Sequence, residues 1–72
     1  MDWFIINEVK EGKTIINASS ILKVHYNEET NLTIIDFNRG AYPSVYVRGN
    51  IMTDIRRLLS AHGHYVSQIG EL

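Results

Sequence analysis

Cysteine is absent from this sequence of 72 residues, and its absence excludes two common supports of very small domains. A chain without cysteine forms neither disulfides nor thiolate zinc sites. A domain of this length buries only about 60% of the surface that its unfolded chain exposes, so its stability margin is small. Oligomerisation is the remaining common support for such a chain, and it stays open.

An excess of charge of one sign is also missing, because 7 lysines and arginines stand against 8 aspartates and glutamates, with a formal net charge of −1. A chain so close to neutrality has no long-range field that favours nucleic acid or an anionic membrane. The apolar run near the N-terminus is too short for a signal peptide or a membrane span. We therefore expect a cytoplasmic protein without membrane contact. Since no repeat or linker-like stretch divides the chain, we expect residues 1–72 to form one domain.

The strongest strand signal is a hairpin pattern over residues 31–48, in which two apolar runs flank the tripeptide at 38–40. A three-residue hairpin loop needs one residue at positive φ, which Gly40 would adopt without steric cost. Apolar residues of both parities over 32–37 predict a strand near the middle of the sheet. Pro43 cannot donate a ladder hydrogen bond, so the return strand is expected at an edge or to contain a bulge.

Three further strand candidates precede this hairpin, at residues 3–9, 14–17 and 22–26. The first has apolar residues on both faces at its start, which indicates a strand covered on both sides or one at an oligomer interface. In the third, Leu22 and Val24 are expected to face the core because apolar and polar residues alternate there. The segment at 18–20 either caps a short helical turn or simply bends the chain.

A helix is predicted over residues 51–62 by one apolar stripe with helical spacing, comprising Ile51, Met52, Ile55, Leu58, Leu59 and His62. Asn50 is the expected N-cap, and Gly63 fits the position that ends the helix. Arg56 and Arg57 lie off this stripe. The elements together predict an α+β fold, an antiparallel β-meander of four to five strands with one C-terminal helix packed on one face.

The predicted partner-binding residues are Arg39, Tyr42, Tyr46 and Arg48. The last three share one parity on the return strand, and Arg39 lies in the adjoining loop. Tyrosine and arginine are over-represented at binding hot spots, and aromatic rings on a sheet also stack nucleobases. We expect a protein partner or self-association as a dimer, with RNA binding by the same face as the alternative. A third interpretation is that the tyrosines only cover a small core and that Arg48 is solvated.

No catalytic or metal signature accompanies these residues. His62 and His64 form an H-x-H pair without a further ligand, and His62 already belongs to the helical stripe, so we expect no metal site. The serines lack a nucleophile context, and the five glycines are too dispersed for a phosphate-binding loop. We therefore expect no enzymatic activity, no cofactor and no small-molecule substrate. The predicted function is that of a non-enzymatic interaction module, such as a regulator or inhibitor of a larger complex.

A family resemblance extends over residues 19–69. It is carried by the short motifs Ser19-Ser20-Ile21, Val24-His25-Tyr26, Phe37-Asn38-Arg39-Gly40 and Gly63-His64-Tyr65. In these motifs the chain resembles the KTSC domain, named for the C-terminus of some lysyl-tRNA synthetases. The stretch 12–59 is similar to the small FlbD-like proteins, through Gly12-Lys13-Thr14 and Ile16-Asn17-Ala18. The first resemblance implies RNA binding. The chain departs from that family in its tyrosines, since Tyr42 and Tyr46 stand four residues apart.

Overall fold

The computed structural model describes residues 3–38, 43–67 and 69–70. In chain order the elements are β1 (Trp3–Glu8), β2 (Gly12–Asn17), the 3-10 helix η1 (Ala18–Ser20), β3 (Ile21–Asn27), β4 (Leu32–Phe37), β5 (Val45–Arg48) and α1 (Met52–Ala61). The predicted α+β class is confirmed, with five antiparallel strands and one C-terminal helix.

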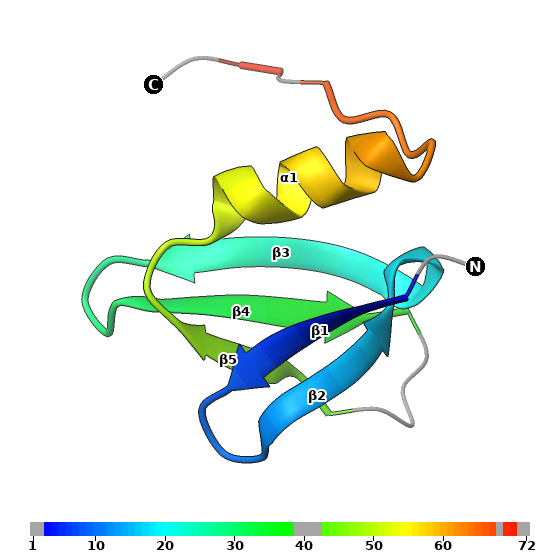
Figure 1. Ribbon diagram of the computed structural model, residues 1–72. Coiled ribbons are helices and arrows are strands. Elements are labelled where there is room, and N and C mark those ends of the chain that lie inside the picture. The colour runs from blue at the N-terminus through cyan, green and yellow to red at the C-terminus, as the bar shows by residue number, and fades with distance from the viewer. Residues whose placement is uncertain (1–2, 39–42, 68, 71–72) are drawn as a thin grey trace.

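The five strands form two sheets instead of one continuous meander. β1 and β2 pair as a hairpin, while β3, β4 and β5 form a three-stranded sheet in that order, so β4 is central as predicted. The two sheets are connected where the Val9 amide donates to the carbonyl oxygen of Tyr46 at 2.8 Å, which joins the end of β1 to β5. In Figure 1 the hairpin turns away from the larger sheet, and α1 lies alongside β3.

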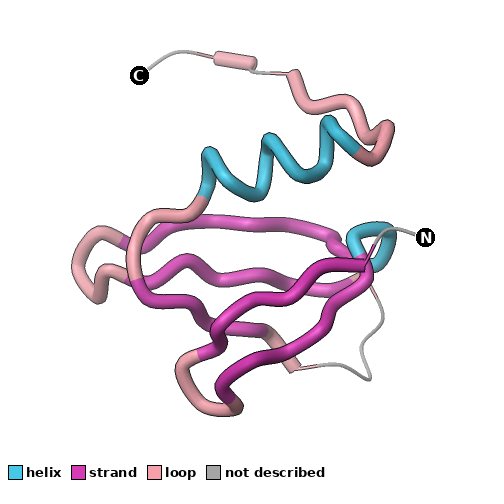
Figure 2. The backbone as a smooth tube through the Cα atoms, viewed as in Figure 1, coloured by secondary structure: helices cyan, strands magenta, loops and turns pink. Residues whose placement is uncertain are grey.

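The core is formed by both sheets and the helix. Ile35, on the central strand β4, is completely buried, and Ile55 of α1 is only 3% exposed. The buried apolar side chains that form one contiguous cluster are Ile6, Ile16, Ile35, Val45, Val47 and Ile55. Because β1, β2, β4, β5 and α1 all contribute to this cluster, each sheet buries its inner face against the other and against the helix. Figure 2 shows the helix lying alongside β3.

A buried hydroxyl group holds the connection between β5 and α1. Thr33 is completely buried on β4, and its Oγ1 donates to the carbonyl oxygen of Gly49 at 2.6 Å. The same oxygen accepts from the amide of Ile51 at 3.1 Å. Gly49 has a φ of +91°, a left-handed conformation that glycine adopts at little cost. The helix start is therefore positioned by a side chain of the central strand.

The helix agrees with its predicted range, but its cap differs. The N-cap residue is Ile51 instead of Asn50, because the Ile51 amide is held by Thr33 and the regular helix begins one residue later. Asn50 Oδ1 still accepts from the Met52 amide at 3.1 Å. At the other end, Gly63 has a φ of +85°, its amide donates to Ser60, and the next amide donates to Leu59. This is the Schellman arrangement that the glycine predicted.

The expectation that Leu22 faces the core is wrong. The pairing of β3 with β4 shifts between Ile21 and Lys23, so Leu22 is an extra residue in the ladder and its side chain is 67% exposed. A β-bulge of this kind changes which side chains face inward. Val24 packs against the core as expected, and Ile21 takes the place predicted for Leu22.

The tight three-residue loop predicted at 38–40 is also wrong in register. β5 begins only at Val45, which pairs with Ile35, and Pro43 and Ser44 are not part of a strand. A hairpin loop of only residues 38–40 would have paired residue 43 with Ile35, whereas Ile35 pairs with Val45. Pro43 has no amide hydrogen to contribute to the ladder, so the regular pairing begins two residues later. Residues 39–42, including Gly40, lie outside the described part of the chain.

Candidate functional site

Two of the four predicted binding residues can be located. Tyr46 and Arg48 lie on β5, on the face opposite the buried Val45 and Val47; Tyr46 is half-buried and Arg48 is exposed. Arg39 and Tyr42 lie outside the described residues, so their membership of the site remains a prediction. The alternation along β5 supports the predicted parity and places both described residues on the outer face of the three-stranded sheet.

The neighbours of Tyr46 and Arg48 on this face are of mixed chemistry. Tyr46 pairs with Ile34, which in turn pairs with His25, and Arg48 pairs with Leu32. At the far end of the face, Lys23 Nζ lies 3.9 Å from Asp36 Oδ2, and Asp36 Oδ1 also accepts from the Ser44 hydroxyl. The face thus combines aliphatic and aromatic surface with charges of both signs. Its described residues lack the concentration of positive charge that phosphate binding uses.

The outer face of the β1–β2 hairpin carries the largest exposed apolar side chains of the two-stranded sheet. Ile5 and Ile15 stand directly opposite each other, and each is 63% exposed. Trp3, on the same face of β1, is 49% exposed. We call these three residues the hairpin face. On the inner side of the same strands, Ile6 and Ile16 are buried in the core. The apolar residues of both parities that the sequence showed in this strand thus correspond to one covered face and one uncovered face.

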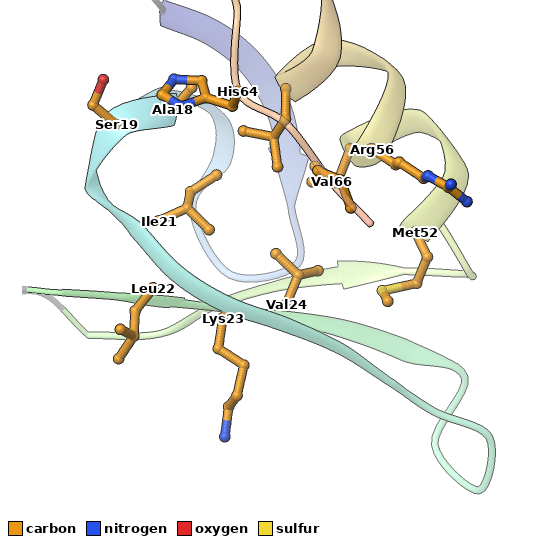
Figure 3. A pocket seen from close by; sticks show the side chains of 12 residues that line it. Ala18, Ser19, Ile21, Leu22, Lys23, Val24, Met52, Arg56, His64 and Val66 are labelled. Carbon is orange, nitrogen blue, oxygen red and sulfur yellow. The ribbon is translucent and has the colours of Figure 1, made fainter. Parts of the chain in front are cut away.

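A groove lies between α1 and β3 (Figure 3). Its volume is ≈ 350 Å³, and η1 and the segment that follows the helix complete its wall. Its apolar lining includes Ile21, Val24, Ile55, Leu59 and Val66. Lys23 and Arg56 also border the groove, but Figure 3 shows the Lys23 side chain directed away from the helix. Sequence reasoning did not identify this site. It placed the two arginines of the helix off the apolar stripe, and the bulge that exposes Leu22 has no local signal.

A second hollow, of ≈ 680 Å³, lies between the hairpin and residues 43–46, and Glu8 is one of its lining residues. Glu8 is only 8% exposed, and its Oε2 accepts from the Glu11 amide at 3.0 Å. This hydrogen bond closes the turn between β1 and β2. The buried carboxylate thus has a structural role in shaping the hairpin.

Within residues 3–38, 43–67 and 69–70, no group of three or more histidines, aspartates and glutamates is arranged to hold a metal ion. In the same part of the chain, no helix has the length and apolar character needed to cross a membrane. His62 and His64, the H-x-H pair of the sequence, lie on either side of Gly63, directly after the last residue of α1.

Comparison of the chain with known protein families, with curated proteins and with solved structures finds no match in any of the three. The candidate sites therefore rest on their own geometry and chemistry.

Proposed function

We propose that this chain is a non-enzymatic protein-interaction module and that its partner covers the hairpin face, Trp3, Ile5 and Ile15. The observation that supports this most directly is the cross-strand pair Ile5–Ile15, which leaves two isoleucine side chains 63% exposed on a regular sheet surface. Single exposed apolar residues are ordinary, but adjacent ones on a flat face are typical of protein contacts.

Burial of the hairpin face supplies only part of the free energy of specific binding, because association itself costs about 4–15 kcal/mol. Complete burial of one large aliphatic side chain stabilises a complex by about 1.5–3 kcal/mol, so the partial burial of the two isoleucines and Trp3 offers about 3–5 kcal/mol before association costs. Tryptophan is also enriched at binding hot spots. Tyr46 lies next to the end of this hairpin, because the Val9 amide binds its carbonyl oxygen. The predicted residue Tyr46 therefore fits the margin of the same surface.

Self-association and a different protein partner are the two forms of this proposal. A net charge of −1 opposes a second copy only weakly, since repulsion between two such chains is small. RNA binding through Tyr46 and Arg48 is the less favoured function, because Lys23 on that face is already beside Asp36. Salt dependence separates RNA from protein, since counterion release weakens only the phosphate contacts steeply.

The test compares wild type with an Ile5→Thr/Ile15→Thr variant, in which threonine retains β-branching while the apolar surface is reduced. Light scattering at increasing protein concentration measures self-association, and a pull-down from nuclease-treated host lysate measures a different partner. We expect dimer formation or capture of one protein to weaken at least about tenfold in the variant. Leu22→Thr is the matched control, because this exposed side chain lies on β3.

A monomeric wild type that captures nothing would refute the proposal, as would equal capture by wild type and the hairpin variant. Retention of RNA alone from a parallel lysate without nuclease, lost at moderate salt, would replace it with the RNA-binding function.

A further inference from the structure

The two outermost strands differ in how they are protected against pairing with another chain. Within the described residues, β2 and β3 are each paired on one side only, by β1 and β4 respectively. An open strand edge is a template for a further strand, and proteins protect such edges with bulges, lysines or a covering helix. β3 has all three, because its pairing shifts at Leu22, Lys23 is 65% exposed and α1 lies alongside it (Figure 1).

The edge of β2 has little protection of this kind. Its pairing with β1 runs in one uninterrupted register, and residues 14–17 contain no charge, proline or glycine. Lys13, near the turn, is the strand's one charged residue. In the described part of the chain, residues 43–46 are separated from β2 by the hollow of ≈ 680 Å³, and no backbone hydrogen bond joins the two segments. This edge is therefore open to another strand.

The residues of β2 fit a second copy of the same strand. A two-fold axis through Ile15, perpendicular to the sheet, pairs two β2 strands antiparallel and keeps their equivalent faces on the same side. In this register Ile15 lies opposite Ile15 of the second copy, and Lys13 lies opposite the uncharged Asn17. Like charges are not opposed within residues 13–17, and Gly12, whose φ is +77°, stays outside the pairing.

We propose that the β2 edges of two copies of this chain pair antiparallel around Ile15 and form one four-stranded sheet. Ile5 and Ile15, which are paired and each 63% exposed, then form a row of four isoleucines with their equivalents in the second copy. Aliphatic side chains directly opposite each other stabilise such pairing. The inference goes beyond the proposed function, because it concerns the main-chain groups of the β2 edge and not only the side chains of the hairpin face.

Disulfide formation between introduced cysteines tests the geometry of this dimer, because the chain has no cysteine of its own. Directly opposite residues of two antiparallel strands have Cα atoms about 4.5–5.5 Å apart. This separation is within the range that a disulfide spans. The full chain carrying Ile15→Cys should therefore form a covalent dimer in a glutathione buffer, measured as a rate on non-reducing gels. Circular dichroism checks that each variant is folded.

Two matched variants place a cysteine on the same face but away from the axis. Ile5 is exposed to the same extent as Ile15, but in the dimer it lies about 14 Å from its equivalent, across three strand spacings of about 4.8 Å. Lys13 lies on β2 itself, and four residues at about 3.3 Å each also separate it from its equivalent by about 14 Å. Ile5→Cys and Lys13→Cys should therefore form the covalent dimer at least about tenfold more slowly than Ile15→Cys.

Charge substitutions test the same geometry without cysteine. Ile15→Lys places two like charges directly opposite each other, so it should weaken the self-association of the full chain at least about fivefold in sedimentation equilibrium. Ile5→Lys is the control, because its charges are separated by more than the screening length of about 8 Å at physiological salt. It should weaken self-association less than about twofold.

Three results would overturn the proposal. They are a wild type that stays monomeric up to millimolar concentration, equal rates for Ile5→Cys and Ile15→Cys, and equal effects of the two lysine substitutions. Equal cysteine rates in a wild type that does dimerise would mean that the hairpin faces stack on each other, which would leave the proposed function standing. A monomeric wild type that captures a different protein through the hairpin face would likewise exclude the edge pairing alone.

Discussion

Replacement of Thr33 by valine removes one buried hydroxyl group and leaves the shape of the side chain nearly unchanged. Thr33 is completely buried, and its Oγ1 is within hydrogen-bond distance of both the Gly49 carbonyl oxygen (2.6 Å) and the Ile51 amide (3.1 Å). Valine satisfies neither group. The perturbation therefore tests whether the connection from β5 to α1 is held by this single oxygen.

The expected loss follows from the two hydrogen bonds. Each contributes about 0.5–1.5 kcal/mol net, and a donor or acceptor left buried without a partner costs about 1–3 kcal/mol. Because Gly49 and Ile51 are only half-buried, water reaches them in part. We expect a loss of about 1.5–3 kcal/mol in the free energy of unfolding. For a chain of 72 residues the total is about 4–11 kcal/mol, so this loss is a large fraction of it.

Urea unfolding followed by circular dichroism measures this loss. With an m-value near 1 kcal/mol/M for so small a domain, the midpoint should fall by about 1.5–3 M. Thr30→Val is the control, because Thr30 is exposed in the turn between β3 and β4 and should change the free energy by less than about 0.5 kcal/mol. Amide exchange at Ile51 should accelerate selectively in the Thr33 variant. A midpoint within experimental error of wild type would refute the role assigned to this hydroxyl group.

Three further substitutions test the fold. Gly49→Ala should cost about 1–2 kcal/mol through the backbone alone, because φ is +91° and an added Cβ meets nothing within 4 Å; thermal unfolding measures it, and an unchanged melting temperature would contradict the left-handed assignment. Ile35→Val should lower the free energy of unfolding by about 0.5–1.5 kcal/mol at this fully buried position, and a neutral result in urea would argue against its central place in the core. Lys23→Gln should change stability by less than about 0.5 kcal/mol, since the Lys23 side chain is 65% exposed and its nitrogen lies 3.9 Å from Asp36; a larger loss in the same assay would show that the pair is structural.

Part of the candidate surface could be predicted from the sequence. The parity of Tyr46 and Arg48 placed them together on one strand face, and the structure has them on the outer face of β5. The groove could not be predicted, because it depends on how α1 crosses β3. That crossing places Arg56, one of two adjacent arginines, at the border of the groove, while Arg57 does not line it.

The sequence by itself determined where strands and helix form and which of their faces are apolar. The apolar runs of both parities over β1 and β4 and the helical stripe around Ile55 are local properties, because side-chain direction repeats every two residues in a strand and every 3.6 residues in a helix. Only the tertiary structure decided which apolar face is covered. The inner face of the hairpin packs against α1 and the larger sheet, while Ile5 and Ile15 remain exposed. Likewise, the bulge at Leu22 depends on pairing with β4, since register is a relation between two strands and not a property of either one.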